Sequence, residues 1–205
     1  MFAKSAFFAL LACLPQQAPI PVGTKLPPYS FLLSLGEQRG RSHCYVCESL
    51  EKPVVIFFAP AKDPKANEKW VSAEVTQLTK FLDGELAKRP TLAAWMTFGH
   101  TKQEELDGPI VRWGETTGLR KLPVGTYEDP LGPPAFRLGG KAILYAVIAK
   151  EGKVEKVFSL DAAEGVAAFQ TILNGELDRI APIPKAEPKP VTVPEIKPGS
   201  APPKK

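Results

Sequence analysis

The chain has 205 residues, of which 44% are hydrophobic and 23% are charged, and its net charge is +4. These ordinary values favour one globular domain of about 150 residues with non-globular ends. Most of the basic excess lies after residue 181, so the rest of the chain is close to neutral. Without a basic face on the folded part, the sequence predicts no nucleic-acid partner.

Residues 1–21 are similar to a bacterial secretory leader and linker. Lys4 precedes a short apolar run, as in signal peptides, and the run is too short to span a bilayer. The sequence Leu-Leu-Ala-Cys that ends at Cys13 resembles a lipoprotein box, in which the cysteine is lipidated after cleavage. We therefore expect export, either to the periplasm or to a membrane through an acylated Cys13. The alternative is a frayed apolar N-terminus with an incidental cysteine.

Residues 22–35 are predicted to form an extended lead-in and a strand that ends at Gly36. Ser42 is expected to cap a short helix that continues through residue 50. Pro53 then turns the chain out of this helix. The apolar, β-branched run 54–59 that follows is typical of a strand buried on both faces of a sheet.

The next elements alternate between helix and strand. Apolar residues at helical spacing predict a long helix over 66–88. A strand over 91–99, a helix over 103–117 and a short extended segment over 122–127 follow. A loop rich in glycine and proline then precedes the last elements.

The C-terminal part is predicted to be a hairpin and a helix. Strands 141–149 and 153–160 pair across a tight turn at Gly152. Asp161 and Glu164 have the spacing of a capping box that begins the last helix. The Asn174-Gly175 dipeptide is expected to end that helix.

This order predicts an α/β fold. A strand-helix-strand-helix-strand half, followed by an antiparallel hairpin and a helix, gives a three-layer sandwich around a mixed sheet of about five strands. Eight of the 22 prolines lie in residues 181–205, where few apolar groups remain to be buried, so disorder is expected there. We therefore expect a leader and linker over 1–21, one domain over 22–180 and a Pro/Lys-rich tail over 181–205.

Cys44 and Cys47 have Cys-x-x-Cys spacing, and three interpretations of this pair are open. In the first, a structural disulfide in an oxidising compartment adds about 2 kcal/mol of stability. In the second, the first turn of a helix stabilises a Cys44 thiolate, which attacks while Cys47 resolves, and a protonated His43 assists. In the third, His43 and both cysteines bind a metal with a distant His100. Zinc sites usually show two such cysteine pairs, so we predict no metal site, and no motif indicates another cofactor.

The order of elements is similar to the thioredoxin-like fold, and the opening Val-Gly-Thr-Lys-Leu-Pro-Pro-Tyr-Ser-Phe of residues 22–31 resembles the start of redoxin domains. The segment Ser-His-Cys-Tyr-Val-Cys over 42–47, before a Pro-Val-Val strand, resembles exported bacterial thioredoxin-like proteins with a Cys-x-x-Cys before the central strand. The likeness covers residues 22–177. It implies a thiol-disulfide oxidoreductase whose partners are protein thiols or disulfides.

Two departures from this family leave the activity open. A working thioredoxin carries its Cys-x-x-Cys just after the central strand, where residues 59–63 here read Ala-Pro-Ala-Lys-Asp. The family also places a cis-proline directly before the first hairpin strand, and residues 137–141 contain no proline. The chain is therefore either an oxidoreductase with a displaced Cys44/Cys47 pair or a non-catalytic binding or scaffold module in which that pair is a structural disulfide.

Overall fold

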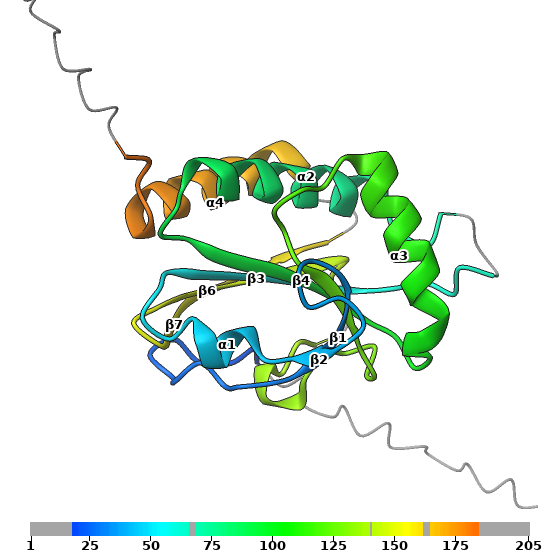
Figure 1. Ribbon diagram of the computed structural model, residues 1–205. Coiled ribbons are helices and arrows are strands. Elements are labelled where there is room, and N and C mark those ends of the chain that lie inside the picture. Colours follow the sequence, from blue (N-terminus) through cyan, green and yellow to red (C-terminus); the bar gives the residue numbers. More distant parts are fainter. Residues whose placement is uncertain (1–17, 66–68, 140, 162–164, 185–205) are drawn as a thin grey trace, which may run out of the picture.

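A seven-stranded mixed sheet runs through the centre of the computed structural model, which describes residues 18–65, 69–139, 141–161 and 165–184 (Figure 1). The elements in chain order are β1 (Phe31–Leu35), β2 (Ser42–His43), α1 (Tyr45–Glu48), β3 (Val54–Pro60), α2 (Ala73–Lys88), β4 (Ala93–Gly99), α3 (Gln103–Thr117), β5 (Val124–Tyr127), the 3-10 turn η1 (Pro134–Phe136), β6 (Leu144–Lys150), β7 (Lys153–Leu160) and α4 (Val166–Ile180). The strand order across the sheet is β2-β1-β5-β4-β3-β6-β7.

Three parallel strands, β3, β4 and β5, form the middle of the sheet, and the other strands pair antiparallel to their neighbours. The chain steps from β3 to β4 to β5 in one direction, and connections of this kind are right-handed. The two crossover helices α2 and α3 therefore lie on the same face of the sheet. Helix α4 joins them there, and the three helices supply the larger hydrophobic core.

The opposite face is covered mainly by the extended N-terminal segment, by α1 and by η1, which enclose a second hydrophobic core. Tyr29 is buried in this layer. Its hydroxyl accepts a hydrogen bond from the Trp95 indole at 2.7 Å and lies 2.9 Å from the Thr97 hydroxyl. Burial raises the pKa of Tyr29 well above its ordinary value, so the phenol stays neutral. The second core is therefore tied to β4 by hydrogen bonds as well as by packing.

The α/β fold, the three layers and the central position of β3 are confirmed. Strand β3 is buried along almost its whole length and is flanked by β4 and β6. The sheet has seven strands, however, so the expected number of about five was wrong. Every extended segment that the sequence indicated joins the sheet. Ser42 and His43 add a further short strand by pairing with β1.

The predicted start of two helices was also wrong. Ser42 does not cap α1, because it is paired in β2, and Cys44 occupies the N-cap position instead. Helix α2 begins at Ala73 rather than at residue 66, and the Ser72 hydroxyl accepts from the Val75 amide at 3.3 Å. A serine side chain that satisfies a free amide of the first turn fixes the start of a helix.

Helix α4 differs from its prediction at both ends. It begins at Val166 with Gly165 as its N-cap, so Asp161 does not cap it, and Glu164 lies outside the described residues. It passes through Asn174-Gly175 and ends at Ile180. A mid-helix glycine costs about 1 kcal/mol. Burial of Leu177 and Ile180 beyond this glycine stabilises the helix by about 1.5 kcal/mol or more per side chain, which outweighs that cost.

The predicted leader up to residue 17 and the tail from residue 185 lie outside the described residues. Ile20 is buried in the second core, and its amide donates to the Phe136 carbonyl at 3.0 Å. Within the described part of the chain, no helix combines the length and the apolar character needed to cross a membrane.

Candidate functional site

Cys44 and Cys47 are joined by a disulfide bond, with 2.07 Å between the sulfur atoms and 5.4 Å between the Cα atoms. Cys44 is the N-cap residue of α1, and its sulfur accepts a hydrogen bond from the Cys47 amide at 3.3 Å. Cys47 is exposed and Cys44 is half-buried. Cys47 is therefore the more accessible residue of the pair.

Helix α1 is short, and packing rather than length holds it in place. Val46 is 1% exposed and belongs to the second core. The Tyr45 ring stacks on Trp95, with 5.6 Å between the ring centroids, and also contacts Phe31. A four-residue helix is not stable by itself. These contacts fix α1 on the sheet and present the disulfide on its outer side.

The strand register shows where α1 begins. Paired residues on neighbouring strands form a row across the sheet from β2 to β3, which consists of Ser42, Leu32, Thr126, Phe98 and Ala59. Cys44 follows this row by two residues. From there α1 carries the chain back across the second face to Val54, the amino end of β3. The Cys-x-x-Cys pair thus precedes the central strand, as the sequence predicted.

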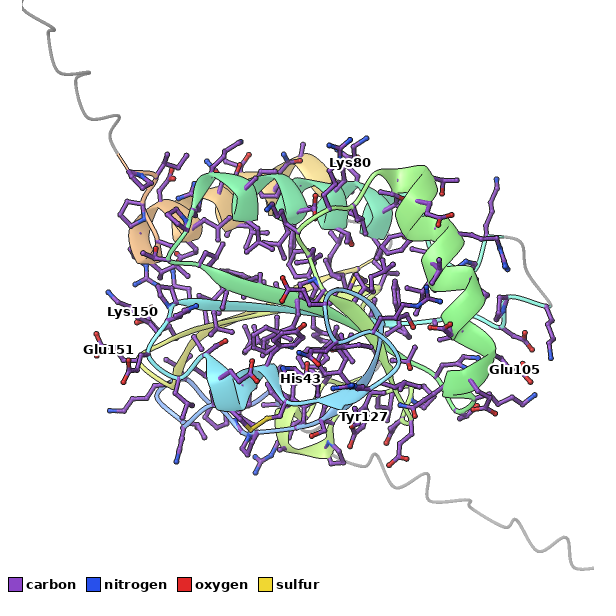
Figure 2. The ribbon with its side chains drawn as sticks, viewed as in Figure 1. His43, Lys80, Glu105, Tyr127, Lys150 and Glu151 are labelled. Carbon is purple, nitrogen blue, oxygen red and sulfur yellow. A yellow bond between two sulfur atoms is a disulfide. The ribbon has the colours of Figure 1, made fainter. Side chains whose placement is uncertain are left out.

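His43, which the redox interpretation expects to assist when protonated, lies against Tyr45 and Glu48 of α1. Its side chain is 16% exposed, and its ring meets the Tyr45 ring edge-on at 4.4 Å. Its Nε2 lies 3.2 Å from the Glu48 carboxylate. That approach lacks hydrogen-bond geometry, so Nε2 is buried without a hydrogen-bond partner among the described residues. Figure 2 shows His43 beside α1, on the opposite side of the sheet from Lys80 of α2.

The residues of the metal interpretation do not form a metal site. His100 follows β4, and its Nδ1 accepts from the Lys102 amide at 3.1 Å. Cys44 and Cys47 are bonded to each other. Across the described ranges, no group of three or more histidine, cysteine, aspartate or glutamate side chains is arranged to hold a metal ion.

The position that carries the thioredoxin cysteines contains apolar side chains in this chain. The Ala61 amide continues the sheet by donating to the Gly99 carbonyl at 3.0 Å. A pocket of about 270 Å³ beside Pro60 is lined largely by apolar side chains, among them Trp70 and Phe98. Residues 59–63 and the described lining of this pocket contain no cysteine.

Sequence reasoning missed a polar pocket of about 370 Å³ next to α1. Its charged lining comes from three separate segments, with Glu37 after β1, Glu48 on α1, and Arg120 and Lys121 before β5. No local spacing connects these positions. The pairing of β1 with β5 and the packing of α1 on the sheet bring them together, so the linear sequence held no signal for this pocket.

No protein-family model matches the chain. No curated protein matches it either. Solved structures do match. The yeast mitochondrial 1-Cys peroxiredoxin aligns with a TM-score of 0.54 and 10% identity over 78% of each chain. A protein of Bacteroides thetaiotaomicron, provisionally assigned as a protein disulfide isomerase, aligns with a TM-score of 0.53 and 18% identity, over 78% of this chain and 91% of that one.

A third structure, of a Chlorobium tepidum protein provisionally assigned as the thiol:disulfide interchange protein DsbE, aligns with a TM-score of 0.52 and 16% identity. The alignment covers 76% of this chain and 97% of that one. Likeness at this level of identity establishes the fold. The protein has a thioredoxin-like α/β fold, with a disulfide-bonded Cys-x-x-Cys pair before its central strand.

Proposed function

We propose that the protein is a thiol-disulfide oxidoreductase that works through Cys44 and Cys47 instead of through the position after the central strand. The observation that carries this proposal is a disulfide between an exposed and a half-buried cysteine. The sulfur of the half-buried Cys44 accepts a hydrogen bond from a backbone amide. The provisional names of the Bacteroides and Chlorobium proteins, which share the fold, support the same class of reaction.

The proposed reaction begins with attack of a substrate thiolate on the exposed Cys47 sulfur. The Cys44–Cys47 bond breaks, Cys44 leaves as a thiolate, and a mixed disulfide joins Cys47 to the substrate. The Cys47 amide, which already donates to Cys44, stabilises the departing anion, because hydrogen bonds to ionised acceptors are stronger. A second substrate thiolate then releases the substrate disulfide and leaves Cys47 reduced. In the reverse direction the reduced pair attacks a substrate disulfide. Exposure thus favours Cys47 for the contact with substrate, the role that the sequence assigned to Cys44.

Reduction of insulin by dithiothreitol, with the purified protein as catalyst, tests this function. We expect catalysis by the native chain and none by either Cys44→Ser or Cys47→Ser. The Cys44→Ser variant keeps the exposed sulfur and should accumulate a mixed disulfide with substrate, detectable as a mass shift. Native protein that is inactive, or activity that persists in both variants, would overturn the proposal.

A structural disulfide is the second candidate, and the packing of α1 favours it. Cys44 and Tyr45 contact the second core, and Val46 is buried within it. The midpoint potential of the pair separates the two functions. A value far below about −300 mV would identify a structural bond, and a less negative value a labile one. In the structural case, the protein is a binding or scaffold module.

Export and lipid anchoring extend the proposal to the ends of the chain. The pattern in residues 1–21 supports cleavage before Cys13 and acylation of its sulfur, followed by a domain over 22–180 and a tail over 181–205. Full-length protein produced in a bacterium should sediment with the membrane fraction. The Cys13→Ser chain should lose that association. Membrane association that is equal for both chains would contradict acylation.

A further inference from the structure

The polar pocket beside α1 brings side chains of both charges together with residues that flank the two cysteines in the sequence. Its volume is about 370 Å³, within the range of small-molecule sites. Its polar lining includes Glu37, His43, Tyr45, Glu48, Arg120 and Lys121. Three of these residues belong to the segment that carries the redox pair, since His43 directly precedes Cys44, and Glu48 directly follows Cys47.

Backbone hydrogen bonds fix the position of Arg120 and Lys121, the cationic part of the pocket. The amides of Arg120 and Lys121 donate to the Asp83 carboxylate, the latter at 2.7 Å. This fixes the loop before β5. Both side chains are exposed. Within the described ranges, neither makes an ion pair or a side-chain hydrogen bond, so both are available to an anionic group.

The acidic part of the pocket faces the phenol of Tyr45. Burial raises the pKa of Tyr45 above its ordinary value, and the negative charges of Glu48 and Glu37 raise it further. Both carboxylates line the pocket together with Tyr45. Glu37 is exposed and has no ion pair in the described part of the chain, and Glu48 approaches His43 without hydrogen-bond geometry. The carboxylates are thus available to an ammonium group.

We infer that this pocket binds the amino-acid group of a low-molecular-weight thiol, so that the substrate of the Cys44–Cys47 pair is a small zwitterionic thiol or its disulfide. The inference rests on the proposed function. A carboxylate of the ligand pairs with Arg120 and Lys121, and its ammonium group pairs with Glu37 and Glu48. This arrangement holds the thiol beside α1. A thiol with only one of the two charged groups uses half of the pocket.

The exchange consumes two molecules of the thiol. The first thiolate forms a bond with the Cys47 sulfur, and the Cys44–Cys47 bond breaks to give a Cys44 thiolate. The second thiolate attacks the sulfur of the bound thiol, which releases the small disulfide and a Cys47 thiolate. The protein disulfide gains two electrons, the two thiols lose them, and both protein thiolates take up protons from water.

Three small thiols test this assignment, namely cysteine, cysteamine, which lacks the carboxylate, and 3-mercaptopropionate, which lacks the ammonium group. The measured quantity is the rate at which each thiol reduces the pair, in the native chain and in each variant. Each variant is compared with the native chain for the same thiol, so differences in intrinsic reactivity between the thiols cancel. For Arg120→Ala/Lys121→Ala we expect a loss of about fivefold with cysteine and 3-mercaptopropionate, and little change with cysteamine.

Glu37→Gln provides the opposite test. It should slow reduction by cysteine and cysteamine and leave 3-mercaptopropionate unchanged or faster. A general electrostatic effect would instead speed every anionic thiol, cysteine included, so a faster reaction with cysteine overturns the inference. Lys80→Ala is the matched control, because Lys80 lies on α2 across the sheet from the pocket (Figure 2), and it should not change any of the three rates.

Binding is measured separately from chemistry in the Cys44→Ser/Cys47→Ser chain. S-methylcysteine has both charged groups and no thiol. It should shift the amide resonances of residues around the pocket, and the Arg120→Ala/Lys121→Ala change should abolish those shifts. A pair that exchanges with all thiols but responds to no pocket variant overturns this inference and leaves the proposed function intact. In the opposite outcome, S-methylcysteine binds to the double-serine chain but the native pair exchanges with no thiol. That result overturns the proposed function and, with it, the substrate assignment.

Discussion

Arg89 shows how a single residue connects two helices and the end of the described fold. It is 1% exposed, and its guanidinium donates to Glu85 at 2.9 Å, to Asp178 at 2.6 Å and to the Ala181 carbonyl at 2.7 Å. Every polar contact of this buried cation is therefore with α2 or with the end of α4. A buried charge that keeps its partners is tolerated, and one that loses them is costly.

Replacement of Arg89 by methionine should destabilise the protein by about 3 kcal/mol, because the buried Glu85 carboxylate and the Ala181 carbonyl would lose their donor. The measurement is the urea midpoint at constant m-value. Lys88→Met is the control, since Lys88 contacts the same Glu85 at 2.7 Å but is 57% exposed. It should cost no more than about 1 kcal/mol. Equal losses in the two variants would contradict this account of Arg89.

The same cluster predicts how stability depends on pH. Burial raises the pKa of the Glu85 carboxyl, but hydrogen bonds from Lys88 and Arg89 and their charges outweigh it, so the pKa lies below its ordinary value. A depressed pKa in the folded state gives stability that is full above the unfolded pKa of about 4.3 and is lost as the pH falls through the folded value. Native protein should therefore lose stability steadily below about pH 5. Glu85→Gln should make this acid limb shallower, and an unchanged slope would argue against the assignment.

At the scale of elements, two glycines have opposite roles. A Cβ atom at Gly125 of β5 would lie 2.2 Å from the Leu32 carbonyl oxygen and 2.7 Å from the Phe31 ring. A Cβ atom at Gly175 of α4 would meet nothing within 4 Å, and this glycine does not have a positive φ. The first glycine permits β1 and β5 to approach closely, and the second only weakens a helix.

Gly125→Ala should cost about 3 kcal/mol, because the backbone of β1 must move to accept the methyl group. Gly175→Ala should raise stability by about 0.5 to 1 kcal/mol, since alanine is the better helix former. Thermal unfolding of both variants provides the measurement. The second result also checks the course of α4. If the helix ended at Asn174-Gly175, the glycine would adopt a left-handed conformation and alanine would destabilise it.

The sequence predicted best the bounds of those elements whose start and end depend on their own residues and adjacent turns. The bounds of α3 and β7 match their predicted ranges, because a helical period marks α3 and the turn at Gly152 marks the start of β7. Strand β2 was missed because two residues have no period, and its pairing with β1 depends on turns at Gly36 and Gly40. The end of α4 was missed because burial of its last turn against α2 outweighs a local stop signal.

At the scale of the whole molecule, the disulfide is a local feature of a fold with two cores. The larger core lies between the sheet and helices α2, α3 and α4, and the second core lies on the other face. The bond closes a ring over a sequence separation of three. Such a short loop restricts the unfolded chain little. The fold should therefore survive without it.

The Cys44→Ser/Cys47→Ser chain should unfold in one cooperative transition, with a loss of no more than about 2 kcal/mol relative to the oxidised native chain. Circular dichroism during urea unfolding measures this. Native protein after reduction serves as the control for the substitutions themselves, and it should match the variant. A variant that is unfolded in buffer would show that the second layer depends on the bond.

The candidate site could be predicted only in part. Spacing alone identified Cys44 and Cys47, and the proline before β3 located them upstream of the central strand. The exposure of each cysteine depends on the packing of Val46 and Tyr45 against strands far away in the sequence, so no pattern revealed which cysteine is exposed. The charged pocket next to α1 arises from the pairing of β1 with β5, which the sequence did not specify.

The stacking of Tyr45 on Trp95 gives the protein a built-in optical probe. Trp95 lies under α1, whereas Trp70 and Trp113 pack together on the other face of the sheet. We expect reduction of the Cys44–Cys47 bond to alter the surroundings of Trp95 and of neither other tryptophan. The emission of Trp95 should therefore follow the oxidation state in real time, against a constant background from the other two.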